Sequence, residues 1–178
     1  MSIRSIALVL GAAGCATTAP QGTARHDLMQ SANATLGEME TRDPGLPSLL
    51  DTAQAYAVFP DVGAAGALVA GGAYGKGILY EHGVPTGYVE LRQGSIGLEL
   101  GGQTFAELVV LSSQDEVDRL KAGSFDVGAS ASAVALKAGA AATARLQPGS
   151  TAFVMPRGGL MAGISVHGQQ IQYRPLSG

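Results

Sequence analysis

The chain has 178 residues, of which 46% are hydrophobic and only 14% are charged, and it contains 26 glycines. This composition is too apolar for an acidic disordered protein, and the glycines lack the three-residue period of collagen. The formal net charge of −3 argues against a globally basic nucleic-acid-binding surface, and a single cysteine excludes an intramolecular disulfide. The length suffices for one domain with a hydrophobic core.

The first fourteen residues have the layout of a secretory signal peptide. One positive charge, Arg4, precedes an uncharged apolar run over residues 6–13, and small residues then lead to Cys15. The apolar run is too short to cross a bilayer as a helix. A signal peptide that ends on cysteine resembles the lipobox of bacterial lipoproteins, in which the cysteine is acylated and becomes the first residue of the mature chain.

We therefore predict that Cys15 is the lipidation site, that residues 1–14 are a lipoprotein signal peptide, and that residues 15–25 are a flexible tether. Two alternatives remain: an ordinary signal peptide with a chance cysteine, and a cytosolic N-terminus, since Ala12 stands where the lipobox prefers Leu. No acidic residue directly follows the cysteine, as in lipoproteins sent to the outer membrane. The expected location is the bacterial cell envelope, at the outer membrane facing the periplasm.

Two helices are predicted after the tether. Residues 26–42 carry Leu, Met and Ala at helical intervals, and Asp-Pro-Gly at 43–45 ends that segment. A second helix is predicted over residues 48–58, where Ser48 can cap the first turn. Pro60 is expected to close this helix, because the residue before a proline disfavours helical geometry.

From Pro60 onward the pattern changes to short runs bounded by glycine. Residues 88–92 alternate between polar and apolar side chains, which is typical of an antiparallel strand with one exposed face. Glycine inside strands marks bulges or close backbone approach. We predict that Gly97 and Gly163 serve packing, so that valine at either position destabilises the fold.

One helix is predicted to interrupt the strands. Ser113 followed by Glu116 fits a capping box, and Gly123 is placed to stop the helix. The Ala-, Ser- and Gly-rich segment that follows reads either as a loose linker or as packed strands, and its period of two over residues 127–135 favours strands. Three more short strands are predicted near the end of the chain, over residues 151–156, 159–168 and 170–175.

The sequence carries no recognisable catalytic or metal-binding motif. The run "GGAYGKG" lacks both the first glycine and the Ser or Thr of a phosphate-binding loop. The three histidines, His26, His82 and His167, are far apart and make no metal-ligand spacing. The nucleophile motif G-x-S-x-G is absent as well. We therefore expect a protein that is not an enzyme and needs no cofactor.

Four glycine-rich segments resemble the SYLF domain family, a Ysc84-like group of lipid-binding proteins. In order they are "AYAVFPDVGAAGALVAGGAYGKGILY", "GSIGLELGGQ", "FDVGASASAV" and "GGLMAGISVHG", which extend the resemblance over residues 53–173. The resemblance implies binding to lipid, notably anionic head groups and phosphoinositides in eukaryotic members, some of which also associate with actin. This chain departs from many members because it lacks a Trp near the position of Tyr88 and has no strongly basic helix.

The predicted fold is α+β, with N-terminal helices packed on a glycine-rich, mainly antiparallel β-sheet or barrel-like body with one inserted helix. Residues 26–178 are expected to form this single domain. Given the resemblance, the predicted function is a non-catalytic lipid-binding envelope lipoprotein whose body binds phospholipid. The alternatives are a structural or protein-interaction module of the envelope and an unrecognised hydrolase. The expected partner is the membrane, which the protein contacts through the acyl anchor and the body. No binding to nucleic acid is expected.

Lys76 and Arg157 are the candidate head-group-binding residues. Each lies in a glycine-rich stretch, where backbone N–H groups can help to hold a phosphate. The competing interpretation is that both are solvated turn charges, as most surface charges are. The formal charge becomes −4 once residues 1–14 are removed with Arg4. The overall field therefore cannot draw the body to an anionic membrane, and binding must rest on a local site.

Overall fold

The computed structural model of the chain describes residues 22–67, 70–96, 101–127, 131–144, 149–159 and 168–176. Cys15, Gly97 and Gly163 lie outside the described residues. The described helices are α1 (Thr23–Arg42), α2 (Leu46–Leu50), α3 (Gln114–Lys121) and α5 (Ala140–Ala144). The described strands are β1 (Ala55–Ala67), β2 (Ala70–Glu81), β3 (Val84–Ile96), β4 (Gly101–Leu111), β5 (Ala131–Ala135), β6 (Ser150–Gly159) and β7 (Gln169–Pro175).

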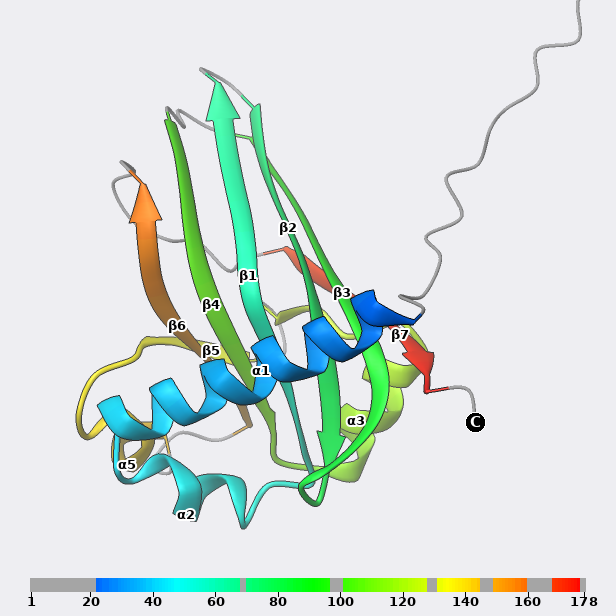
Figure 1. Ribbon diagram of the computed structural model, residues 1–178, viewed down its shortest axis with the longest axis vertical. Coiled ribbons are helices and arrows are strands. Elements are labelled where there is room, and N and C mark those ends of the chain that lie inside the picture. Colours follow the sequence, from blue (N-terminus) through cyan, green and yellow to red (C-terminus); the bar gives the residue numbers. More distant parts are fainter. Residues whose placement is uncertain are drawn as a thin grey trace, which may run out of the picture.

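The described strands form one sheet in the order β5-β6-β4-β1-β2-β3-β7 (Figure 1). Every neighbouring pair is antiparallel except β5 and β6, which run parallel. The sheet is open, with β5 and β7 at its edges. The prediction of an α+β fold with a mainly antiparallel sheet is confirmed, and of its two forms the open sheet, not the barrel, is correct.

Helices cover both faces of the sheet. We call the side of α1, α2 and α5 the front face and the side of α3 the back face (Figure 1). Apolar residues of α1, α2 and α5 pack with Val58, Ile78 and Phe153 on the front face. Leu120 of α3 packs with Phe59 and other apolar side chains on the back face. The strands are therefore buried on both sides where the helices lie, which accounts for their continuous apolar runs.

The first predicted helix is confirmed and begins slightly earlier than expected, at Thr23. Its C-terminus is fixed by Asp43, whose buried carboxylate accepts hydrogen bonds from the backbone N–H groups of Gly45, Gly139 and Ala141 at 3.1, 3.2 and 2.6 Å. Burial alone would raise the pKa of Asp43, but these hydrogen bonds lower the pKa overall. One carboxylate thus ties the end of α1 to the start of α5.

The second predicted helix is largely wrong. Helix α2 ends at Leu50, and residues 55–58 begin the central strand β1, which pairs with both β2 and β4. The apolar run over residues 55–59 is buried on both faces, so its periodicity cannot distinguish a strand from a buried helix. Pro60 does not end a helix. It lies in a bulge of β1, where proline is tolerated inside a sheet.

The helix between β4 and β5 is confirmed in detail. Ser113 Oγ accepts a hydrogen bond from the Glu116 N–H, and the Glu116 carboxylate accepts one from the Ser113 N–H at 3.0 Å, which completes the capping box. Gly123 has a φ of 73° and Ser124 N–H donates to the Arg119 carbonyl, as in a Schellman motif. These two signals are local, so the sequence alone located the helix.

The alanine-rich segment holds both a strand and a short helix. Residues 131–135 form β5, as the period of two predicts, whereas residues 140–144 form α5. The predicted strands over 151–156 and 170–175 are confirmed as parts of β6 and β7. Most of the predicted strand over 159–168 lies outside the described residues.

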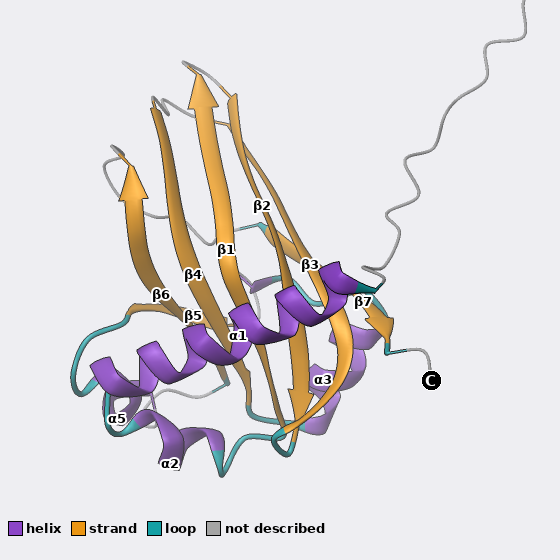
Figure 2. Ribbon diagram, viewed as in Figure 1, coloured by secondary structure: helices purple, strands orange, loops and turns teal. Residues whose placement is uncertain are grey.

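The strands extend well beyond the helices at one end of the sheet (Figure 2). We call this part the glycine-rich end and define it as residues 61–67, 70–76, 92–96, 101–104 and 156–159. Glycine and alanine dominate it, whereas bulky side chains fill the helix-covered half. The sheet therefore has one half with two packed faces and one half whose strands project past the helices.

Candidate functional site

Lys76 lies on β2 at the glycine-rich end, with an exposed side chain on the front face. Its in-register neighbours are Asp61 on β1 and Glu90 on β3, so a carboxylate-bearing residue stands on each side. Tyr74, two residues away on the same face, is 43% exposed and pairs with Gly63 and Arg92. Lys76 is thus an accessible cation beside an accessible aromatic ring.

Arg157 lies on the same face but is held by the fold. Its guanidinium donates a hydrogen bond to Thr35 Oγ1 at 2.8 Å and lies 3.4 Å from the Glu38 carboxylate, both on α1. The side chain is 31% exposed, and its Nε lies 3.9 Å from the Asp61 carboxylate. Arg157 therefore joins β6 to α1 and to β1 across the front face.

The structure brings the two predicted head-group residues to one face, with Asp61 between them. The bulge at Pro60 makes this possible: three steps along β1 oppose two along β2, so Asp61 and Val62 exchange faces relative to an unbroken strand. Val62 then enters the back core, and Asp61 turns to the front with 76% of its side chain exposed. Sequence reasoning missed Asp61 because only the strand register places it beside residues 76 and 157.

Charges on this face are nearly balanced. Arg92 donates to the Glu90 carboxylate with its Nε at 2.6 Å, and Asp61 and Glu38 flank Arg157. An incoming anion must therefore compete with carboxylates that are already in place. Such exposed pairs are worth little individually and weaken in salt. A purely electrostatic phosphate site is not what this geometry favours.

An open groove lies next to these residues. It has a volume of about 460 Å³ and is lined almost wholly by small residues of β1, β4 and β6: Gly63, Ala64, Ala65, Gly102, Gln103, Thr104 and Gly158. A Cβ atom built at Gly63 would meet nothing within 4 Å, so the glycine leaves space open instead of relieving a clash. Since Gly63 pairs with Tyr74, the groove adjoins the exposed ring.

A fully buried carboxyl group lies on the opposite face of the sheet. Glu107 of β4 has no exposed surface, and its Oε2 accepts a hydrogen bond from Gln169 Nε2 of β7 at 3.2 Å. Burial raises the pKa of Glu107 to about 8, although the bond from Gln169 lowers it somewhat. Among the described residues, neither Glu107 Oε1 nor Gln169 Oε1 has a hydrogen-bond partner. Because this pKa lies above 7, the carboxyl group is mostly protonated at neutral pH, and it has no exposed surface.

Sequence reasoning also missed Glu107. In the run "FAELVVL" it reads as the polar residue of an alternating strand, but both faces of β4 are buried here. Within the described ranges, no three His, Cys, Asp or Glu residues gather closely enough to hold a metal ion. In the same ranges, no helix has the length and apolar character needed to cross a membrane.

Comparison with known proteins finds a family model that matches part of the chain. Residues 92–175, from the end of β3 through β7, match the family model Ysc84, described as Las17-binding protein actin regulator. No curated protein matches the chain. The matched range lies almost entirely within the residues that carry the glycine-rich segments, and it contains β4, α3 and β6. Over residues 92–175 the chain is thus similar to the Ysc84 (SYLF) family, in agreement with the resemblance seen in the sequence.

Proposed function

We propose that this SYLF-like protein is a non-catalytic, lipid-binding lipoprotein of the bacterial cell envelope, anchored through Cys15. In this proposal the glycine-rich end of the sheet contacts phospholipid. The observation that carries the proposal is the open groove of glycine and alanine beside the exposed Tyr74. Accessible apolar surface of this kind is typical of membrane or partner contacts, and tyrosine suits the boundary between apolar and wet surroundings.

Contact with lipid is expected to rest more on this surface than on charge. The formal charge of the whole chain is −3, and the cations of the front face are paired with or flanked by carboxylates. In our proposal Lys76 contacts a phosphate by a charge-assisted hydrogen bond. Arg157 contributes chiefly by holding α1 in place, since its guanidinium is already bonded to Thr35. The expected preference for anionic over neutral lipid is therefore modest.

Vesicle flotation tests the proposal. A chain that starts at residue 22, where the described structure begins, is mixed with anionic or neutral phospholipid vesicles at low and at physiological salt. We expect binding to both, with more to the anionic vesicles. Tyr74→Ala should weaken binding to both vesicle types, whereas Lys76→Ala should remove only the preference for anionic vesicles. Lys137→Ala is the matched control, because Lys137 is exposed next to α5, outside the glycine-rich end.

The second candidate is a structural or protein-interaction module of the envelope. The family description names members as binding proteins, and the same open groove suits a protein partner as well as a lipid. Flotation separates the two candidates. The interaction module is favoured if the chain floats with neither vesicle type. It is also favoured if neither Tyr74→Ala nor Lys76→Ala changes the amount of protein that floats.

A further inference from the structure

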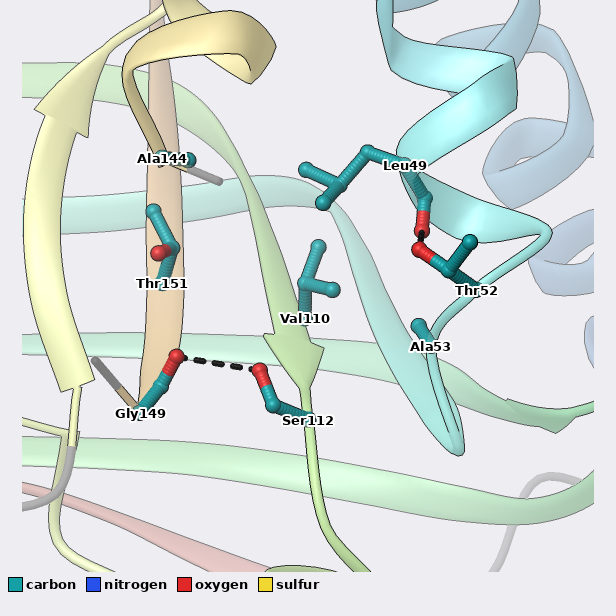
Figure 3. A pocket seen from close by; sticks show the side chains of 8 residues that line it. All are labelled: Leu49, Thr52, Ala53, Val110, Ser112, Ala144, Gly149 and Thr151. Carbon is teal, nitrogen blue, oxygen red and sulfur yellow. Dashed lines mark hydrogen bonds between the residues drawn. The ribbon is translucent and has the colours of Figure 1, made fainter. Parts of the chain in front are cut away.

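A cavity lies at the other end of β4 and β6 from the glycine-rich end, between the sheet and the short helices α2 and α5 (Figure 3). Its volume is about 200 Å³. The lining residues come from α2 and the turn after it, from the end of α5, and from β4 and β6 with their adjoining residues: Leu49, Thr52, Ala53, Val110, Ser112, Ala144, Gly149 and Thr151.

The lining divides into an aliphatic part and a hydroxyl-bearing part. Leu49, Val110 and the two alanines supply the aliphatic part. The hydroxyl of Ser112 donates to the Gly149 carbonyl at 3.0 Å, and that of Thr52 donates to the Leu49 carbonyl at 2.8 Å, as Figure 3 shows. Both hydroxyl protons are therefore used within the protein, and each oxygen keeps acceptor capacity.

Thr151 differs from these two residues. It pairs in register with Val110 on the front face and is only 4% exposed. Its hydroxyl makes no side-chain hydrogen bond to another residue in the described part of the chain. Its oxygen is not among the fully buried side-chain atoms that lack a partner, so it keeps accessible surface where Thr151 lines the cavity. The hydroxyl is thus available to donate one hydrogen bond and accept others at the cavity wall.

The lining determines what the cavity can hold. Among the described residues no charged side chain lines it, so a charged ligand would lose its hydration without gaining a partner from them. An apolar cavity of about 150 Å³ accommodates benzene, so a volume of about 200 Å³ suits one small ring or a comparable aliphatic group with a polar substituent. An acyl chain of a membrane phospholipid is too large.

We propose that this cavity binds a small uncharged molecule with a compact hydrocarbon body and one hydroxyl group, which hydrogen-bonds to Thr151. The site is separate from the lipid-contacting surface proposed above and stands or falls independently of it. Because such a ligand has few atoms, its dissociation constant is expected on the order of 1 mM.

Phenol is the probe, and NMR spectra of the full chain with labelled methyl groups give the measurement. Phenol should shift the methyl signals of Leu49 and Val110 in a saturable manner. Toluene has the same ring and no hydroxyl, and it should bind about threefold to tenfold more weakly, as expected for the loss of one hydrogen bond. Benzoate, which is charged, should not bind.

Variants of Thr151 connect the binding to its hydroxyl. Thr151→Val keeps the shape and should abolish the preference for phenol over toluene, whereas Thr151→Ser should retain it. Thr23→Val, at the exposed start of α1, is the matched control and should leave the affinities for phenol and toluene unchanged. Equal affinities for phenol and toluene in the unaltered chain would overturn the proposal, even if Thr151→Val fails to fold. Shifts confined to methyl groups away from the cavity would overturn it as well.

Discussion

The two halves of the sheet have the same strand pairing but differ in the size and packing of their side chains. In the helix-covered half, Phe59, Leu79 and Phe153 are fully buried, and both faces of the strands are packed. At the glycine-rich end, the strands pair just as regularly, but Gly63, Ala65 and Gly102 leave an open groove. Hydrogen-bonded ladders therefore persist where side-chain packing stops. The covered half holds the fold together, and the other half is free to present a surface.

Polar groups follow the same division. Those of the covered half are buried: Asp43 accepts hydrogen bonds from backbone N–H groups, and Glu107 accepts one from the side-chain amide of Gln169. On the front face at and near the glycine-rich end they lie in pairs of opposite sign, and their side-chain exposure ranges from 13% for Glu90 to 76% for Asp61. Loss of a buried polar partner is expensive, whereas loss of an exposed pair is not. Substitutions in the two halves should therefore have different consequences.

The largest effect is expected at Glu107 and depends on pH. Its pKa of about 8 in the folded protein lies above the ordinary value of 4.5, so the folded state binds more protons between these limits and stability falls as pH rises through them. The full cost, reached above pH 8, is roughly 5 kcal/mol from 1.36 kcal/mol per pKa unit. Glu107→Gln removes this cost, so its advantage over the unaltered chain should grow from pH 5 to pH 8.

Urea unfolding at several pH values measures this advantage. Glu90→Gln, which removes a carboxylate from the front face of β3, is the control and should show no comparable growth with pH. A stability difference between Glu107→Gln and the unaltered chain that stays constant over this range would mean that Glu107 is ionised throughout.

An intermediate effect is expected from the same glycine-to-valine change made in each half. A Cβ atom at Gly77 would collide with the Val58 carbonyl oxygen and lie 2.8 Å from the Phe59 ring. Gly77→Val should therefore cost about 3 kcal/mol or more in the free energy of unfolding, through overpacking. A Cβ atom at Gly63 would meet nothing within 4 Å, so Gly63→Val should cost little. Thermal unfolding compares the two variants, and equal losses would contradict the proposed division of the sheet.

The smallest effect separates the two cations of the front face. Arg157→Ala removes the bond to Thr35 and the contact with Glu38, and should lower the free energy of unfolding by about 1 kcal/mol. Lys76→Ala should leave stability within about 0.5 kcal/mol of the unaltered chain, as exposed substitutions usually do. Urea unfolding of both variants gives the comparison. If Lys76→Ala is the more destabilising, Lys76 has a structural role that our interpretation does not include.

Local signals in the sequence were sufficient for part of the fold. The capping box at Ser113, the stop at Gly123 and the helical spacing of residues 26–42 located two helices, because each depends on neighbours within a few positions. The prediction over residues 48–58 was largely wrong for the opposite reason. Burial on both faces removed the alternation that identifies a strand, and only pairing with β2 and β4 decides the conformation.

In the candidate site, too, the sequence predicted some residues and missed those that only the tertiary structure brings into place. The sequence by itself determined the α+β class, the family resemblance and the two cations that were expected near a phosphate. The bulge at Pro60 turned Asp61 toward those cations, and packing on both faces buried Glu107 without a charged partner among the described residues. These outcomes depend on strand register and on which elements cover each face. Residues far apart in the chain set both, so no local pattern contains them.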